Sequence, residues 1–168
     1  LSSLIDKDGR ITVKGFYDDV VELSAEDRAM LSRAPFDLEE YKSSIGICGV
    51  KGEKGYTTME RQTIRPSLDV NGIWGGFTGE GAKTVIPTEA HAKVSMRLVP
   101  NQLSSKISKL FIDHIRSIAP DYVKVEVFEH HGGDGFLIPI SSKAYQAAER
   151  AMGEVYGIRP VPSRGGGS

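Results

Sequence analysis

Two stretches of alternating polarity, joined by a glycine-dense segment, constrain the fold of this chain more than any other feature. In residues 64–71 apolar side chains alternate with polar ones, and in residues 90–98 Ala, Val, Met and Leu share one face while polar residues occupy the other. A period of two is typical of a half-buried strand. We therefore expect two strands here, with Pro66 at a free edge because proline cannot donate a hydrogen bond to a neighbouring strand.

The segment between the strands, GGFTGEGAKT at residues 75–84, has the composition of a phosphate-binding loop but not its spacing. A Walker loop places its lysine directly after the last glycine and continues into a helix. Here Ala82 separates Gly81 from Lys83, and a strand follows instead. We therefore expect no nucleotide site in this segment.

Helical signals flank the two strands. Capping residues predict short helices after Ser24 and Asp37, and apolar residues at helical spacing predict a longer helix over residues 100–118. One of two serines, at residues 141–142, caps a further helix that Gly157 closes.

Two more strands are expected outside the central pair. A short one covers residues 10–13, and alternating valines predict another over residues 123–128. After the central pair, the order strand, strand, helix, strand predicts an α+β fold in which helices cover an antiparallel sheet. If the chain before Leu1 supplies a strand and most of a helix, the complete unit is ferredoxin-like.

Charge and composition narrow the class of partner. The 168 residues include 21 basic and 22 acidic ones, for a net charge of −1, so no basic field favours nucleic acid or anionic lipid. No apolar run is long enough to span a membrane. The one cysteine, Cys48, excludes an internal disulfide framework and suits a reducing, cytoplasmic compartment. We expect it to be a small buried apolar side chain.

Histidines offer little for metal binding. His130 and His131, with Asp134 nearby, are the one cluster that resembles metal ligands. Adjacent residues of an extended chain point to opposite faces, so the two imidazoles cannot easily share an ion, and we favour a polar strand exit. His114 lies beside the apolar stripe of the long helix, where we expect a hydrogen-bonded, structural histidine.

Short motifs run through almost the whole chain, at residues 15–20, 60–61, 65–66, 71–72, 79–81, 83–87, 92–93, 97–102 and, as R-x-G-G-S, 164–168. Their sequences and their order resemble the M20 family of metallopeptidases, and within it the dipeptidase and carnosinase-like branch. In that branch the matching stretch belongs to the lid, or dimerisation, domain.

The resemblance implies three parts. Residues 1–59 hold the end of a lid helix and a segment that wraps around the domain, residues 60–130 form the lid core, and residues 131–168 return toward a catalytic domain of the same parent chain. In the family, the metal ligands and the catalytic Glu lie mostly before the lid, and one further His ligand follows it. The resemblance therefore implies two zinc ions in the parent enzyme, none bound by this chain, which alone should be inactive, and a homodimer formed through the lid.

The same resemblance implies four substrate-binding residues. Arg97 matches the arginine that binds the substrate's carboxylate, and Thr84 matches a threonine at that same substrate end. Gly167 and Ser168 match the Gly-Ser of the return segment, which can hydrogen-bond a ligand. A planar guanidinium suits paired hydrogen bonds to a carboxylate. The alternatives are a solvated arginine for Arg97, a strand-starting threonine for Thr84 and an engineered tail for the last four residues. The substrate that the resemblance implies is a small peptide or an N-acyl amino acid.

An alternative from another class is a free-standing ferredoxin-like module that binds a small ligand. RNA is disfavoured as that ligand because the predicted sheet shows no paired aromatic residues on which bases could stack. A stand-alone module does not explain the carboxy-terminal helix and glycine-rich end, which need another domain to pack against. We therefore favour the lid and dimerisation fragment, and expect the chain to be part of a longer protein.

Overall fold

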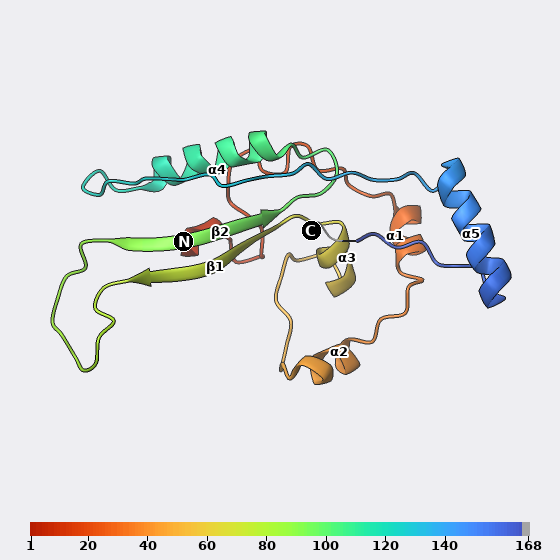
Figure 1. Ribbon diagram of the computed structural model, residues 1–168, viewed down its shortest axis with the longest axis horizontal. Helices are drawn as coiled ribbons and strands as arrows, with labels where there is room; N and C mark the ends of the chain where they lie inside the picture. Colours follow the sequence, from red (N-terminus) through yellow and green to blue (C-terminus); the bar gives the residue numbers. More distant parts are fainter. Residues whose placement is uncertain (166–168) are drawn as a thin grey trace.

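The computed structural model describes residues 1–165. A two-stranded antiparallel sheet, β1 (Ser67–Gly75) and β2 (Ala90–Arg97), lies alongside the long helix α4 (Ser104–Ile118), as Figure 1 shows. The predicted α+β class is confirmed. The shorter 3-10 helix and the remaining α-helices are η1 (Ser2–Leu4), α1 (Ala25–Leu31), α2 (Leu38–Ile45), α3 (Thr58–Thr63) and α5 (Lys143–Tyr156).

The hydrophobic core lies between the sheet, α4 and the amino-terminal segment. Its buried members are Leu4, Ile11, Val13, Phe16, Leu68, Ile107 and Phe111. A buried glutamine joins the chain just after β2 to the amino-terminal segment. The Gln102 side-chain amide donates to the carbonyl of Phe16 at 2.7 Å, and its Oε1 accepts from the amide of Val99 at 3.0 Å. The residues just after β2 are thereby tied to the amino-terminal segment.

A bulge in β1 decides which side chains share the outer face of the sheet. Val70 pairs with Val94 and Gly72 pairs with Lys93, so Asn71 is an extra residue in β1. The extra residue reverses the alternation of the strand beyond it. Trp74 consequently lies beside its partner His91, and the two rings stack with centroids 5.0 Å apart and planes inclined by 6°.

The helix signals in the sequence are confirmed by their caps. Ser24 accepts from the Asp27 amide at the start of α1, and Asp37 accepts from the Glu40 amide at the start of α2. The Ser142 side chain accepts at the start of α5, which ends at a left-handed glycine. The helix predicted over residues 100–118 begins only at Ser104, and four of its apolar residues face the core: Ile107, Leu110, Phe111 and Ile115. Leu103 and Ile118 are exposed.

Two strand predictions are wrong, and a third has the wrong limits. The strand predicted over residues 64–71 is present as β1, but it begins at Ser67, so Pro66 lies just before the strand and not within it. Residues 10–13 form no strand but a single bridge, between Ile5 and Ile11. Residues 123–128 pair with no other strand within residues 1–165. The alternation in their sequence indicated an extended chain, but a strand also needs a hydrogen-bonded neighbour.

Two predictions about single side chains are also wrong. Cys48 is exposed rather than buried. The Nε2 atom of His114 is buried on α4 and makes no hydrogen bond to any described residue, so this histidine is not the satisfied one that the sequence predicted. A buried ring nitrogen without a partner is destabilising unless another group reaches it.

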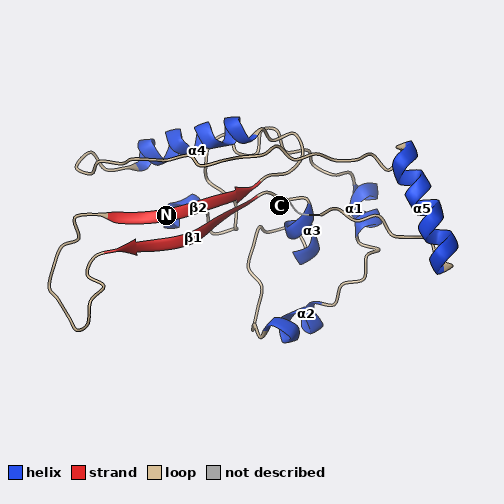
Figure 2. Ribbon diagram, viewed as in Figure 1, coloured by secondary structure: helices blue, strands red, loops and turns tan. Residues whose placement is uncertain are grey.

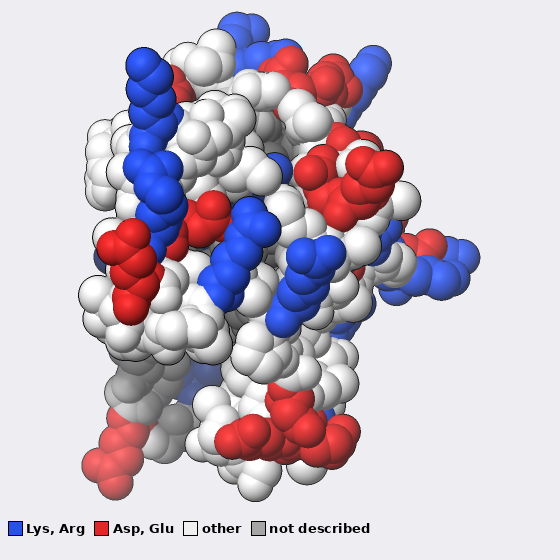
Figure 3. All heavy atoms as spheres, turned by 90° about the vertical axis from the view of Figure 1, so that its right-hand side faces the viewer, with Lys and Arg blue, Asp and Glu red and all other residues white. Residues whose placement is uncertain are grey.

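Parts of the chain stand away from the core. Neither α2 nor α5 has a buried residue, and the loop between α4 and α5 (Figure 2) exposes Tyr122, Phe128 and Phe136. The end of the molecule that carries α5 shows basic and acidic side chains interspersed, with no field of one sign (Figure 3). None of the helices in residues 1–165 is long and apolar enough to cross a membrane.

Candidate functional site

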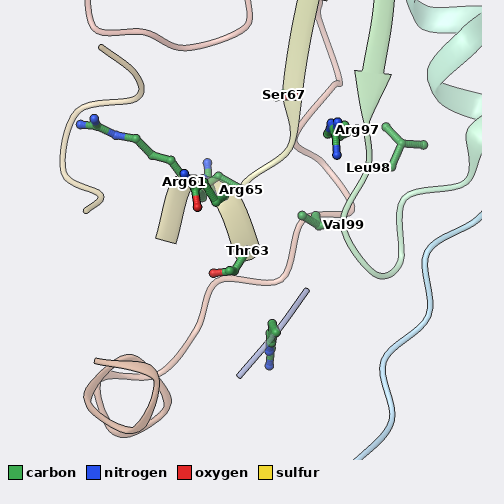
Figure 4. Close-up of a pocket in the computed structure, with 9 residues that line it drawn as sticks. Arg61, Thr63, Arg65, Ser67, Arg97, Leu98 and Val99 are labelled. Atoms are coloured by element: carbon green, nitrogen blue, oxygen red, sulfur yellow. The ribbon is translucent and has the colours of Figure 1, made fainter. Parts of the chain in front are cut away.

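Arg97 lies at the end of β2, at the base of the hairpin, where it pairs with Ser67 of β1. Met96 and Leu98, on either side of it, pack against the core, so the Arg97 side chain lies on the opposite, outer face. Here a pocket of about 550 Å³ opens between the end of β2 and the start of β1 (Figure 4). The pocket is lined by Arg61, Gln62, Thr63, Arg65, Ser67, Arg97, Leu98, Val99 and Arg164.

The lining favours an anion. Its described residues include four arginines and no acidic residue, with hydroxyl groups from Thr63 and Ser67. The arginines are not equivalent, however. Arg61 extends away from the pocket (Figure 4), and its Nε donates to the carbonyl of Glu53 at 2.9 Å. The planar guanidinium of Arg97 suits an anion that can accept paired hydrogen bonds, such as a carboxylate.

Arg65 is buried behind the pocket in an ion-pair cluster. Its side chain is 3% exposed, and its Nε and Nη2 donate to the two oxygens of Glu53, each at 2.8 Å. Its Nη1 donates to Glu22 at 2.8 Å. The guanidinium carbon lies 5.1 Å from the ring centre of Tyr17 and 4.3 Å from that of Tyr56. Burial alone would lower the pKa of Arg65, but the hydrogen bonds and charge of Glu53 outweigh it and raise that pKa above its usual range.

Two carboxylates at the edge of this cluster are held in the charged form. The hydrogen bond from the Tyr56 hydroxyl, at 2.8 Å, lowers the pKa of Glu22, and Arg65 adds to the effect. A hydrogen bond from Arg28 lowers the pKa of Glu60. Glu60 also accepts from the Thr57 amide at 2.7 Å, which completes a capping box at the start of α3.

Acid should therefore destabilise the folded chain through Glu60. Because the folded pKa of Glu60 lies below the ordinary value of 4.5, its stabilisation is complete above that value and is lost as the pH falls through the folded pKa. We expect the melting temperature to fall as the pH is lowered from 5 to 3, and Glu60→Gln to flatten that dependence, since glutamine retains the cap but not the charge. Melting curves of both proteins across this range are the measurement; parallel curves would contradict the assignment.

The structure separates two of the four predicted substrate residues. Thr84 lies in the loop between the strands, beyond the Gly75 and Ala90 pair, whereas Arg97 pairs with Ser67 at the other end of the hairpin (Figure 1). A strand of eight residues is roughly 20 to 25 Å long, so one chain does not bring Thr84 and Arg97 together. Gly167 and Ser168 lie outside the described residues, but Arg164 of the same motif lines the pocket.

The ion-pair cluster has no signal in the sequence. Arg65 is 12 residues from Glu53 and 43 from Glu22, and no local pattern connects residues so far apart. By contrast, the capping box of α3 was visible as Thr57 and Glu60, and we missed it because the apolar alternation that follows favoured a strand.

The histidines and acidic residues do not gather into a metal site. Within residues 1–165 there is no group of three or more His, Cys, Asp or Glu side chains that could hold an ion. Asp134 instead accepts from the amide of Ser104 at the start of α4, at 2.7 Å, and this bond lowers the pKa of Asp134. His91 is half exposed on the outer face of the sheet.

Comparison with known proteins gives consistent relatives. The chain is 32% identical to a Cys-Gly metallodipeptidase of Candida albicans over its whole length, and 33% identical to the human Beta-Ala-His dipeptidase over 99% of it. It covers only 35% and 33% of those two proteins, so it spans about a third of their length.

Solved structures agree with the sequence relatives. An M20 family metallo-carboxypeptidase from Sulfolobus solfataricus superposes with a TM-score of 0.85 at 32% identity, and human carnosine dipeptidase 1 with a TM-score of 0.79 at 33% identity. Each match covers 99% of this chain and 38% or 36% of the other. The sequence model of the M20 family's peptidase dimerisation domain matches residues 3–123. The chain therefore belongs to the M20 peptidase dimerisation domain family.

Proposed function

We propose that this chain is the lid and dimerisation part of a longer, zinc-dependent M20 peptidase, a dipeptidase or related amidohydrolase. Its task is to bind the carboxylate of a small peptide or N-acyl amino acid through Arg97. The observation that carries the proposal is the position of Arg97, on the outer face of a strand and in a pocket lined by arginines and hydroxyl groups. The names of the relatives, which are metallodipeptidases, support the reaction class. The single cysteine suits a cytoplasmic location.

The metal belongs to the rest of the parent. Two-metal hydrolysis needs several carboxylates and imidazoles that converge on ions a few ångströms apart. The described part of this chain brings no such group together, so its residues do not fit a zinc site. The chain contributes orientation instead: a guanidinium on a rigid strand holds one end of the substrate and so fixes the position of the scissile amide bond.

The separation of Thr84 from Arg97 supports a homodimer with shared sites. If both residues bind one substrate, as the family resemblance implies, they come from different subunits, because one hairpin holds them at opposite ends. In a two-fold symmetric dimer, each hairpin loop then reaches the site whose Arg97 belongs to the partner. The poorly buried α5 and the exposed loop before it are the surfaces we assign to contact with the catalytic domain.

A mixed dimer tests this proposal. We expect the parent enzyme to have low activity with either Thr84→Val or Arg97→Ala alone. When the two are produced together, each mixed dimer has one site with both residues intact, so about a quarter of the wild-type activity should return in an equal, random mixture. The assay compares this mixture with each variant alone at a substrate concentration below KM. If mixed dimers form but activity does not return, Thr84 of one subunit and Arg97 of the other do not share a site.

A further inference from the structure

Glu53 binds Arg65, which lies two residues before the start of β1. Its carboxylate is 8% exposed and binds both the Nε and the Nη2 of Arg65, an arrangement in which the two planar groups face each other. Arg10 approaches the same carboxylate at 3.4 Å. The proposed function assigns the contact with the substrate's carboxylate to Arg97, and to neither Glu53 nor Arg65.

The position of Glu53 is itself fixed from both sides. Its carbonyl accepts from the Nε of Arg61, on α3, at 2.9 Å. The amide of the next residue, Lys54, donates to the carbonyl of Asp8 at 2.8 Å. Glu53 therefore lies on a segment without regular secondary structure that is nevertheless held between the amino-terminal turn and α3.

We call the two hydrogen bonds from Arg65 to Glu53 the clamp. A short and stiff stretch of chain joins it to the cross-strand partner of Arg97. Arg65 is followed by Pro66, which is buried and whose ring fixes its φ, and then by Ser67, the first residue of β1. Ser67 is the cross-strand partner of Arg97. Arg65, Ser67 and Arg97 also line the same pocket. A displacement of Arg65 therefore moves the strand end against which Arg97 is placed.

We propose that Glu53 is a positioning residue for Arg97: by clamping Arg65 it fixes the start of β1, and so sets where Arg97 meets the carboxylate of the substrate. This inference rests on the proposed function. A misplacement of about 1 Å remote from the reacting atoms can cost a large factor in rate or affinity. The clamp supplies the required rigidity, because a guanidinium paired through two parallel hydrogen bonds can neither rotate nor slide.

The test uses Glu53→Gln in the longer parent enzyme, with a dipeptide and the same dipeptide as its carboxy-terminal amide. We expect KM for the free acid to rise about tenfold, with kcat little changed and the amide unaffected, because the variant loses binding at the carboxylate alone. In an Arg97→Ala background, Glu53→Gln should add no further change to KM, since residues that act through one another are not additive. A simple loss of packing would raise KM for both substrates and add to the effect of Arg97→Ala.

Two further variants complete the test. Glu22→Ala removes one exposed hydrogen-bond partner of the same arginine and leaves the two hydrogen bonds from Arg65 to Glu53 in place, so its KM should stay near that of the wild type. Arg65→Lys keeps the charge but not the planar fork of the guanidinium. If Glu53→Gln does not fold, Arg65→Lys takes its place, and the same rise in KM for the free acid is expected. Equal changes for acid and amide, or none, would overturn the inference. A wild-type enzyme that does not distinguish acid from amide would instead refute the role of Arg97.

Discussion

Replacing Arg97 with alanine in the longer parent enzyme is expected to raise KM for substrates with a free carboxylate by about 10- to 100-fold. The reason is the loss of hydrogen bonding between two charged groups. One such bond is worth about 1.5–3 kcal/mol, and every 1.4 kcal/mol is a factor of ten, so this range corresponds to a net loss of one bond after water replaces the other. Steady-state kinetics with a dipeptide and its carboxy-terminal amide are the measurement, and the preference for the acid should nearly disappear.

Two matched variants control for charge and position. Arg97→Lys retains the charge but lacks the planar fork, so its KM should be intermediate. Lys93→Ala removes another cation from the outer face of β2, one that lies over the ring of Trp74 at 5.8 Å, and should leave KM nearly unchanged. If Lys93→Ala matched the effect of Arg97→Ala, a diffuse positive field rather than one arginine would bind the carboxylate.

The second large effect is on stability. Phe16 is 1% exposed and belongs to the core between the sheet, α4 and the amino-terminal segment. Phe16→Ala should lower the free energy of unfolding by about 3–5 kcal/mol, the usual cost of an emptied phenylalanine site in a core. Urea unfolding of this 168-residue chain, with and without the substitution, is the measurement.

Phe128 provides the control, because it is the same residue type but 75% exposed. Phe128→Ala should change the free energy of unfolding by less than about 0.5 kcal/mol, as surface substitutions usually do. If the two variants were equally unstable, the amino-terminal segment would not pack as the structure has it.

Local signals in the sequence predicted local structure well. The caps Ser24, Asp37 and Ser142 start helices where expected, because a side chain that accepts from an amide three residues later acts within one turn. The alternation in β2 also predicted its face correctly: Val94 and Met96 pack against the core, and Arg97 lies on the other side.

The predictions that failed concern features that depend on contacts between residues far apart in the sequence. Residues 123–128 have the alternation of a strand, but strand formation needs a hydrogen-bonded neighbour, which no described part of the chain supplies. The clamp of Arg65 by Glu53 and Glu22 arises only when the folded chain brings these residues together. For the same reason, the family resemblance alone named Thr84 and Arg97 without indicating that one hairpin holds them apart.

Hydrolysis of a dipeptide by the longer parent, measured beside this 168-residue chain, tests the account most directly. We predict that the parent hydrolyses the dipeptide, loses that activity when a chelator removes its metal and regains it with zinc, whereas this chain with added zinc hydrolyses nothing. Hydrolysis by the chain alone would contradict the account, because its metal ligands would then lie within these residues. A parent that is inactive with zinc would contradict it equally and favour a domain that only binds its ligand.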